Sequence, residues 1–268
     1  MNENTDIFIY SHKKFTPIVT NPVYKILTNC HDEFTDTNLP VYRDYEGEDN
    51  IADKNLMYNE YTGFYWLWKN YPLKKYIGLN HYRRYYFFKD NVPDLEKIFD
   101  NFEIVLNRPI YFLENQFVIN FDKDVKVWDN RSWYNFWHNV EDFDKLEQLF
   151  NEQFPEYLDG FYKMKNAGYI YNCSLFLMKS EIFKEYCEYV FTVLDAYNKM
   201  FGCETVDAYI KHVEANQDKY IKAHLPYYTI EIQARITGYI AERVLNAYLM
   251  NGENSLEKHS IQFPWIQL

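Results

Sequence analysis

A chain of 268 residues with 47% hydrophobic and 25% charged residues has enough apolar content for a packed core, which argues against disorder. Its formal net charge of −11, without an evident basic face, argues against a nucleic-acid partner or substrate. The four cysteines show neither a C-x-x-C pair nor a metal-ligand spacing, so we expect reduced thiols in a cytosolic protein: Cys30, Cys173, Cys187 and Cys203.

Aromatic residues make up 20% of the chain, and aromatic rings stack well on sugars and nucleobases. Core filling explains the same enrichment, so composition alone does not specify a function. The amino-terminal residues lack the basic start and apolar run of a signal peptide, and no uncharged run approaches the roughly 20 residues that span a bilayer. We therefore expect a cytoplasmic protein, and leave open a peripheral attachment to the inner face of the cell membrane.

The first part of the chain predicts strands at 7–10, 24–28 and 76–80, each a short apolar run. Between the last two strands, an acidic loop at 44–50 precedes a predicted helix over 53–70. That helix carries Met57, Tyr61, Phe64 and Trp68 on one face, and Pro72 ends it.

The second part predicts a strand at 102–106, a helix at 143–150, a strand at 168–178, a long amphipathic helix from Ser180 and a last helix over 232–250. Alternating strands and helices predict an α/β fold, with a Rossmann-like central mixed sheet flanked by helices in a single domain over 1–268. Such folds bind ligands at the carboxyl ends of their strands.

The strongest candidate site is the run His81-Tyr82-Arg83-Arg84-Tyr85, which directly follows the predicted strand at 76–80. Adjacent guanidinium groups are costly to desolvate unless they meet anions, and their geometry matches phosphate oxygens. A departing nucleoside diphosphate needs such cationic stabilisation. A solvated loop with one arginine paired to an acid explains the motif equally well.

Four further segments are candidates. Asn50 and Asp53 lie at a predicted helix start, where they either hold a ribose or serve as ordinary caps. Asn172 interrupts an apolar run and needs a partner, either backbone or ligand. Arg235, Gly238 and Glu242 share one helix face, where an ion pair is the simpler explanation. Asp122-Lys123-Asp124 is a D-x-D sequence, a short and therefore weak signal for Mg²⁺ or Mn²⁺.

Several of these segments together resemble a bacterial glycosyltransferase family of capsule and exopolysaccharide gene clusters, long labelled a domain of unknown function. The most specific block is the helix that ends in Trp68-Lys69-Asn70, followed by the strand into residues 81–85. His12-Lys13, residues 172–179 and the helix segment 235–243 also match. Tyr239 replaces a phenylalanine of the family pattern, Cys173-Ser174 stands where the family prefers methionine, and residues 111–157 match least.

The resemblance implies a GT-A-like fold that binds a nucleotide sugar, with the donor held mainly by residues 1–110 and the acceptor by 111–268. It implies an inverting transfer of a hexose, for which UDP-galactofuranose is our first choice, to a capsule, exopolysaccharide or lipid-linked acceptor. The arginines would then replace a metal ion, although Mn²⁺ or Mg²⁺ is left open. The expected donor-binding residues are His12, Lys13, Asn50, Asp53, His81, Tyr82, Arg83, Arg84, Asn172 and Arg235.

An inverting transfer also needs a base that deprotonates the acceptor hydroxyl, and the candidates are Glu242, Glu60, Asp122 and Asp124. Sequence does not rank them, because geometry decides. Two other functions stay open. One is a non-catalytic carbohydrate-binding or scaffold protein of a polysaccharide assembly complex. The other is a nuclease or phosphotransferase that uses His81 with the aspartates of the D-x-D sequence, which the acidic net charge disfavours.

Overall fold

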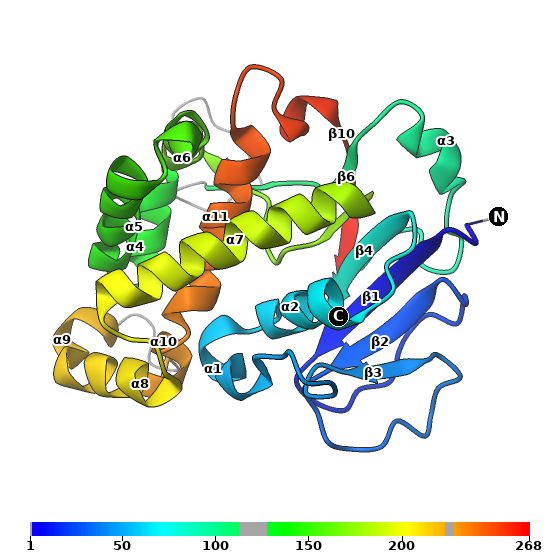
Figure 1. Cartoon of the computed structure of the whole chain (residues 1–268), viewed down its shortest axis with the longest axis horizontal. Helices are drawn as coiled ribbons and strands as arrows, with labels where there is room; N and C mark the ends of the chain where they lie inside the picture. Colours follow the sequence, from blue (N-terminus) through cyan, green and yellow to red (C-terminus); the bar gives the residue numbers. More distant parts are fainter. Residues whose placement is uncertain (1, 113–127, 223–227) are drawn as a thin grey trace, which may run out of the picture.

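The structure is a computed structural model and describes residues 2–112, 128–222 and 228–268 (Figure 1). Within these ranges a nine-stranded mixed sheet has the order β10-β6-β9-β4-β1-β2-β3, with β5 paired to β4 and β11 paired to β5. Its strands are β1 (Thr5–Ser11), β2 (Tyr24–Thr28), β3 (Val41–Arg43), β4 (Tyr76–His81), β5 (Arg84–Tyr86), β6 (Ile104–Asn107), β9 (Phe176–Lys179), β10 (Ser260–Phe263) and β11 (Trp265–Gln267).

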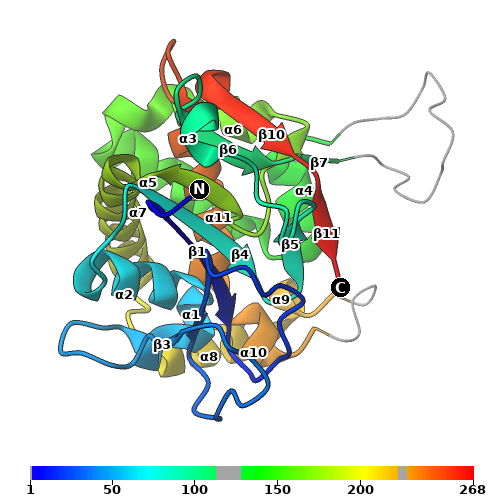
Figure 2. The same ribbon diagram turned by 90° about the vertical axis from the view of Figure 1, so that its right-hand side faces the viewer.

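Most of the central pairs are parallel, which aligns the carboxyl ends of several strands at one edge. β1 runs parallel to β2 and β4, β2 parallel to β3, and β6 parallel to β10, whereas β9 is antiparallel to β4 and β6. Figure 2 shows β5 and β11 beyond the end of β4. The predicted α/β fold with a central mixed sheet flanked by helices is confirmed.

Helices make up most of the remaining secondary structure. They are α1 (Asn55–Tyr58), α2 (Tyr61–Asn70), α3 (Leu95–Phe99), α4 (Asn130–Trp137), α5 (Val140–Gln153), α6 (Leu158–Asn166), α7 (Ser180–Phe201), α8 (Val206–Ala215), α9 (Gln217–Tyr220), α10 (Ile230–Gln233) and α11 (Ile236–Met250). Short 3₁₀ turns precede α1, α6 and β10, and β7 (Ile110–Tyr111) pairs with β8 (Tyr169–Ile170) in a small second sheet.

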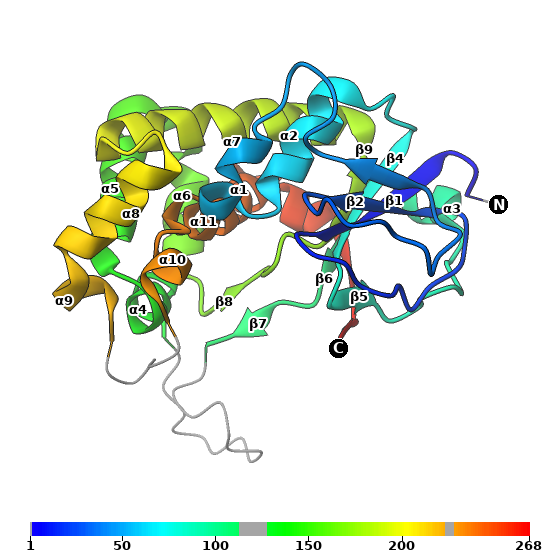
Figure 3. The same cartoon turned by 90° about the horizontal axis from the view of Figure 1, so that it is seen from below.

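Both faces of the main sheet are buried, as the alternation along β1 shows. Phe8 and Tyr10 belong to the larger core, which α2, α7 and α11 cover, whereas Ile7 and Ile9 face a smaller core that includes α3. Figure 3 shows α2 and α7 on one side of the strands. Burial on both faces explains why the strands read as continuous apolar runs.

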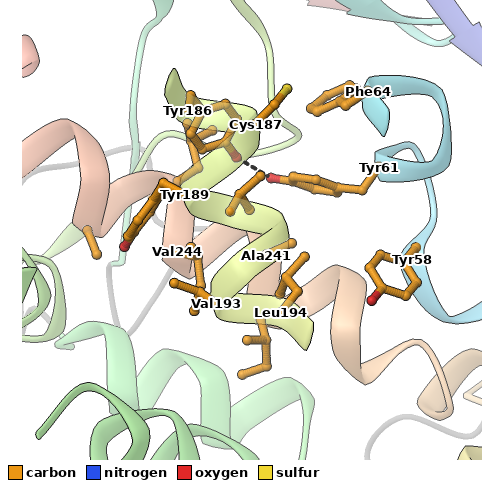
Figure 4. Close-up of a cluster of buried hydrophobic side chains, with 14 of the residues drawn as sticks. Tyr58, Tyr61, Phe64, Tyr186, Cys187, Tyr189, Val193, Leu194, Ala241 and Val244 are labelled. Atoms are coloured by element: carbon orange, nitrogen blue, oxygen red, sulfur yellow. Dashed lines mark hydrogen bonds between the residues drawn. The ribbon is translucent and has the colours of Figure 1, made fainter. Parts of the chain in front are cut away.

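The long helix α7 connects the sheet to the helices around α11. In the close-up of Figure 4, Tyr61 of α2 points at α7, where its hydroxyl lies 3.1 Å from that of Tyr186. On the far side, Ala241 and Val244 of α11 belong to the same buried cluster. A second hydrogen bond of Tyr61, 2.9 Å to the Ser174 hydroxyl, ties α2 to the chain between β8 and β9.

Three elements that the sequence predicts as continuous are interrupted, and in these three respects the prediction is wrong. The helix over 53–70 breaks at Asn59, whose φ is 53°, and the strand over 168–178 breaks at Cys173 and Ser174, with φ of 65° and 50°. The last helix, predicted from residue 232, divides into α10 and α11 at Arg235. Periodicity does not reveal such breaks, because the apolar spacing continues across them.

The cysteines and the helix lengths also bear on the sequence predictions. All four cysteines are unpaired in the structure, and three of them are buried. In the described part of the chain, every helix is too short or too polar to span a bilayer.

One buried carboxyl group makes the free energy of unfolding depend on pH. Asp142 in the first turn of α5 is fully buried and accepts a 2.6 Å hydrogen bond from the Tyr220 hydroxyl and a 3.4 Å bond from Tyr134. Burial raises the pKa of this carboxyl to about 7, because the charged form loses its hydration. Because the ordinary aspartate pKa is about 4, this group stabilises the fold below pH 4, and that stabilisation is lost as the pH rises to 7.

Asp142→Asn removes this titration and keeps the size of the side chain. The difference in unfolding free energy between the variant and the unchanged protein should therefore shift in favour of the variant by about 2–3 kcal/mol when the pH is raised from 5 to 8. Denaturant unfolding at both pH values measures the difference, and comparing the two proteins cancels all other titrating groups. Equal stability differences at the two pH values would show that Asp142 is already ionised in the folded protein.

Candidate active site

A cavity of about 1040 Å³ lies where β1, β2 and β4 end, and α1, α4 and α11 close its other sides. His12 follows β1, Asn29 follows β2, and His81 ends β4, so the parallel strands deliver all three residues to one edge. Nine of the expected donor-binding and base residues line this cavity: His12, Asp53, Glu60, His81, Arg83, Arg84, Asn172, Arg235 and Glu242.

Other residues proposed from the sequence do not line the cavity. Tyr82 is buried behind it, with its ring 5.5 Å from that of His12 and 5.1 Å from the Arg83 guanidinium carbon, and the Lys13 ammonium lies 5.4 Å from the same ring. Asn50 bonds to the Gly47 carbonyl and to the Ala52 N–H, so its side chain closes a turn. Asp122 and Asp124 lie outside the described residues.

Three cavity-lining arginines have no carboxylate partner in the described part of the chain. Of its arginines, only Arg131 and Arg243 form ion pairs there, which leaves Arg83, Arg84 and Arg235 unpaired. The Nε atoms of Arg84 and Arg235 are also buried without a hydrogen-bond partner. Such donors are costly to leave unsatisfied, so these guanidinium groups are suited to an anionic ligand.

Two glutamates of the cavity lie close to these arginines and to each other. Burial and the neighbouring Glu242 raise the pKa of Glu60 to about 7, although Arg84 and Arg235 oppose the shift. Glu242 accepts hydrogen bonds from the Cys173 N–H and from Arg243, both at 3.1 Å. Burial nevertheless raises the pKa of Glu242, because desolvation outweighs these contacts.

Backbone breaks place both glutamates. Glu60 follows Asn59 in its left-handed conformation, and the N–H that holds Glu242 belongs to Cys173, also left-handed. Left-handed backbone is unfavourable outside glycine and recurs at functional sites. Gly238 allows α11 to approach, because a Cβ atom there would lie 2.1 Å from the Asn59 amide nitrogen.

Both histidines at the strand edge are neutral at pH 7. Burial and the neighbouring arginines lower the pKa of His81 to about 3, and burial with Arg235, Lys13 and Arg83 lowers the pKa of His12. The Nδ1 atom of His81 accepts the Arg83 N–H at 3.3 Å, which leaves the Nε2–H of His81 as a donor.

Sequence reasoning missed much of the cavity wall. Its further lining residues include Trp133, Trp137, His138, Tyr239 and Arg243, from α4, the residue after it and α11. The i, i+4 spacing of the two tryptophans was visible, but nothing in the sequence distinguishes a cavity-lining face from a core-facing one. Among the described residues, no three His, Cys, Asp or Glu side chains gather as metal ligands would.

The fold is that of a solved glycosyltransferase structure. The chain superposes on "WbbM bifunctional glycosyltransferase apo structure" with a TM-score of 0.67 and 21% identity, over 98% of this chain and 45% of that one. At this identity the likeness establishes the fold alone, and the chain spans less than half of that protein. The chain belongs to the family described as "Domain of unknown function (DUF4422)", whose profile matches residues 6–215. No curated protein matches the chain.

The contact between Gly238 and Asn59 can be tested through stability. Gly238→Ala places a methyl group against the Asn59 side chain, which should lower the unfolding free energy by about 1–3 kcal/mol. Asn59→Gly removes both that side chain and the left-handed strain, so Gly238→Ala should cost much less in this background. Thermal melts of the unchanged protein, the two single variants and the double variant form a double-mutant cycle. An equal loss in both backgrounds would show that the two residues do not contact each other.

Proposed function

We propose that the chain is a glycosyltransferase that moves a hexose from a UDP-hexose to a saccharide acceptor. The fold likeness and the family resemblance support this class. The main support is the group of unpaired arginines that line the cavity at the carboxyl ends of the parallel strands and at the start of α11. The buried Nε atoms of Arg84 and Arg235 lack partners, and diphosphate oxygens are acceptors of the right charge. Arg83 lies beside them at the rim of the same cavity.

In this proposal the donor diphosphate binds the arginines, and the neutral His81 donates a further hydrogen bond. The arginines then perform the charge stabilisation that a metal ion provides elsewhere. Asp53, at the rim, and Asn29 lie on the side where the nucleoside would bind. Residues 1–110 thus provide most of the donor site and residues 111–268 most of the acceptor site. Arg235, whose cation α11 brings to the donor, and Asn172 are the exceptions.

The transfer itself is proposed to invert the anomeric carbon. The acceptor oxygen forms the new bond to that carbon while its proton passes to Glu60. The bond from the anomeric carbon to the diphosphate breaks, and UDP leaves with the electron pair, held by Arg84 and Arg235. A pKa of about 7 suits Glu60 to this role, because a base works best near the ambient pH. Glu242, fixed by Arg243 and the Cys173 N–H, orients the acceptor.

UDP-galactofuranose remains our first choice of donor, and a growing capsule or exopolysaccharide chain, or a lipid-linked oligosaccharide, our choice of acceptor. These choices rest on the family resemblance of the motifs. We place the reaction in the cytoplasm at the inner face of the membrane.

A donor screen tests the proposal. UDP release should be measured with UDP-galactofuranose, UDP-galactose, UDP-glucose and dTDP-rhamnose, each with Mn²⁺ and with EDTA. We expect turnover of UDP-galactofuranose that survives EDTA, and a loss of at least 100-fold in kcat/KM in Arg84→Ala, because one diphosphate contact disappears. Lys97→Ala, an exposed cation on α3, is the matched control and should stay fully active.

Each other outcome of the screen has a definite meaning. Loss of all activity in EDTA would show that a metal, and not the arginines alone, supports the leaving group. UDP binding, seen as a raised melting temperature, without turnover of any donor would favour a carbohydrate-binding or scaffold protein. If UDP leaves the melting temperature unchanged, the proposed class is wrong.

The pH profile tests the role of Glu60. Because the base must be ionised, kcat/KM should fall about tenfold per pH unit below pH 7. Glu60→Gln should lower kcat by about 10²–10⁴ and abolish that slope, with UDP binding retained. Glu242→Gln is the matched comparison and should raise the acceptor KM more than it lowers kcat. The reverse pattern would make Glu242 the base.

A further inference from the structure

Part of the cavity wall, contributed by α4, the residue after it and α11, is lined by flat aromatic rings. Trp133 and Trp137 lie one turn apart on α4, with ring centroids 5.8 Å apart and both side chains half-buried. Neither indole N–H has a hydrogen-bond partner among the described residues, whereas the buried Trp66 donates to the Glu46 carbonyl. The Trp133 ring stacks on Phe112 with centroids 4.8 Å apart, and the Trp137 ring lies 6.1 Å from that of Tyr228, so the remaining ring surface and the N–H donors are what a ligand can meet.

The same wall continues through a stacked pair. The His138 ring lies 3.9 Å from that of Tyr239, and burial lowers the pKa of His138 to about 3, so the imidazole is neutral. The Gln233 amide nitrogen donates to the Trp137 and Tyr220 carbonyls, so its oxygen accepts from His138 Nδ1 at 3.2 Å. The Nε2 atom of His138 is therefore an uncharged acceptor.

Arg243 connects this wall to the carboxylates. Its side chain is 5% exposed, donates to the Tyr239 carbonyl at 3.0 Å and pairs with Glu242. Its guanidinium carbon lies 4.9 Å from the Tyr134 ring centre, while its Nε is buried without a partner and the residue lines the cavity. A buried, fixed donor without an acceptor indicates a polar ligand atom at this place.

The charge of the lining residues differs from element to element. Unpaired cations come from the strand edge (Arg83 and Arg84) and from the start of α11 (Arg235), the carboxylates are Glu60 and Glu242, and α4 with the residue after it contributes neutral rings. Aromatic faces combined with directional hydrogen bonds suit a neutral sugar ring, which is apolar on its faces and polar at its rim, better than they suit a phosphate.

We infer that Trp133, Trp137, His138, Tyr239 and Arg243 form the subsite for the acceptor's terminal sugar, a neutral pyranose that stacks on the tryptophans. The inference rests on the proposed function, because that sugar must present its hydroxyl to Glu60 while the donor occupies the arginines. A nucleobase would also stack on these rings, but the proposed nucleoside side of the cavity is that of Asn29 and Asp53, which come from other elements than the wall, so we assign the wall to the acceptor.

Binding measurements with simple probes test this subsite. Methyl pyranosides of glucose, galactose and mannose are titrated, with UDP present, by saturation-transfer NMR. We expect at least one to bind the unchanged protein, and Trp137→Leu to weaken it at least tenfold. Trp137→Phe, which keeps a flat ring, should retain most of the affinity. Trp68→Leu, on α2 outside the cavity, is the matched control. Melting temperatures confirm that each variant is folded.

UDP binding and donor hydrolysis without acceptor, measured on the same variants, separate the possible failures. Unchanged UDP binding with lost pyranoside binding supports the inference. Weakened UDP binding in Trp137→Leu would mean that the wall holds the nucleobase, and no binding by any pyranoside would also overturn the inference. Pyranoside binding to a protein that ignores UDP and every nucleotide sugar would instead refute the proposed function and leave the sugar subsite standing.

Discussion

Three interruptions of secondary structure meet at one place, and the cavity depends on that meeting. The chain breaks between α1 and α2, between β8 and β9, and between α10 and α11. Hydrogen bonds from Tyr61 to Ser174 and from the Cys173 N–H to Glu242, with the contact of Gly238 and Asn59, join the three breaks. At a break the backbone and its flanking polar side chains lose their regular partners. Of the residues at the breaks, Asn59, Glu60, Cys173 and Arg235 line the cavity.

The breaks also explain how an acidic protein maintains a cationic site. The net charge is −11, yet three arginines face the cavity without a carboxylate partner in the described part of the chain. Arg83 and Arg84 are placed by the end of β4, and Arg235 by the start of α11. Because the carboxylates nearest to them are themselves partly desolvated, with raised pKa values, their charge does not fully neutralise the arginines.

The alternation of elements and one motif were predictable from the sequence. Apolar runs identified β1, β2, β4 and α7, because burial on both faces of a sheet, or along one side of a helix, requires apolar residues at regular positions in the local sequence. The run 81–85 could be assigned to a strand end for the same reason. Asn50 shows the limit: it resembles a ligand-binding cap in sequence, but its side chain closes a turn with Gly47 and Ala52.

By itself, the sequence determined the α/β class, the order of the main strands along the chain and the cationic residues after β4, since local periodicity and chain direction decide these features. Only the tertiary structure decided that Glu60 and Glu242 face each other, that Arg235 joins Arg84, and that Trp133 and Trp137 line a cavity instead of a core. The reason is physical: Glu60 and Glu242, like Arg84 and Arg235, are far apart in sequence and are brought together by tertiary packing, including that of α11 against α1. A local pattern on α4 likewise does not tell whether a helix face lines a cavity or a core.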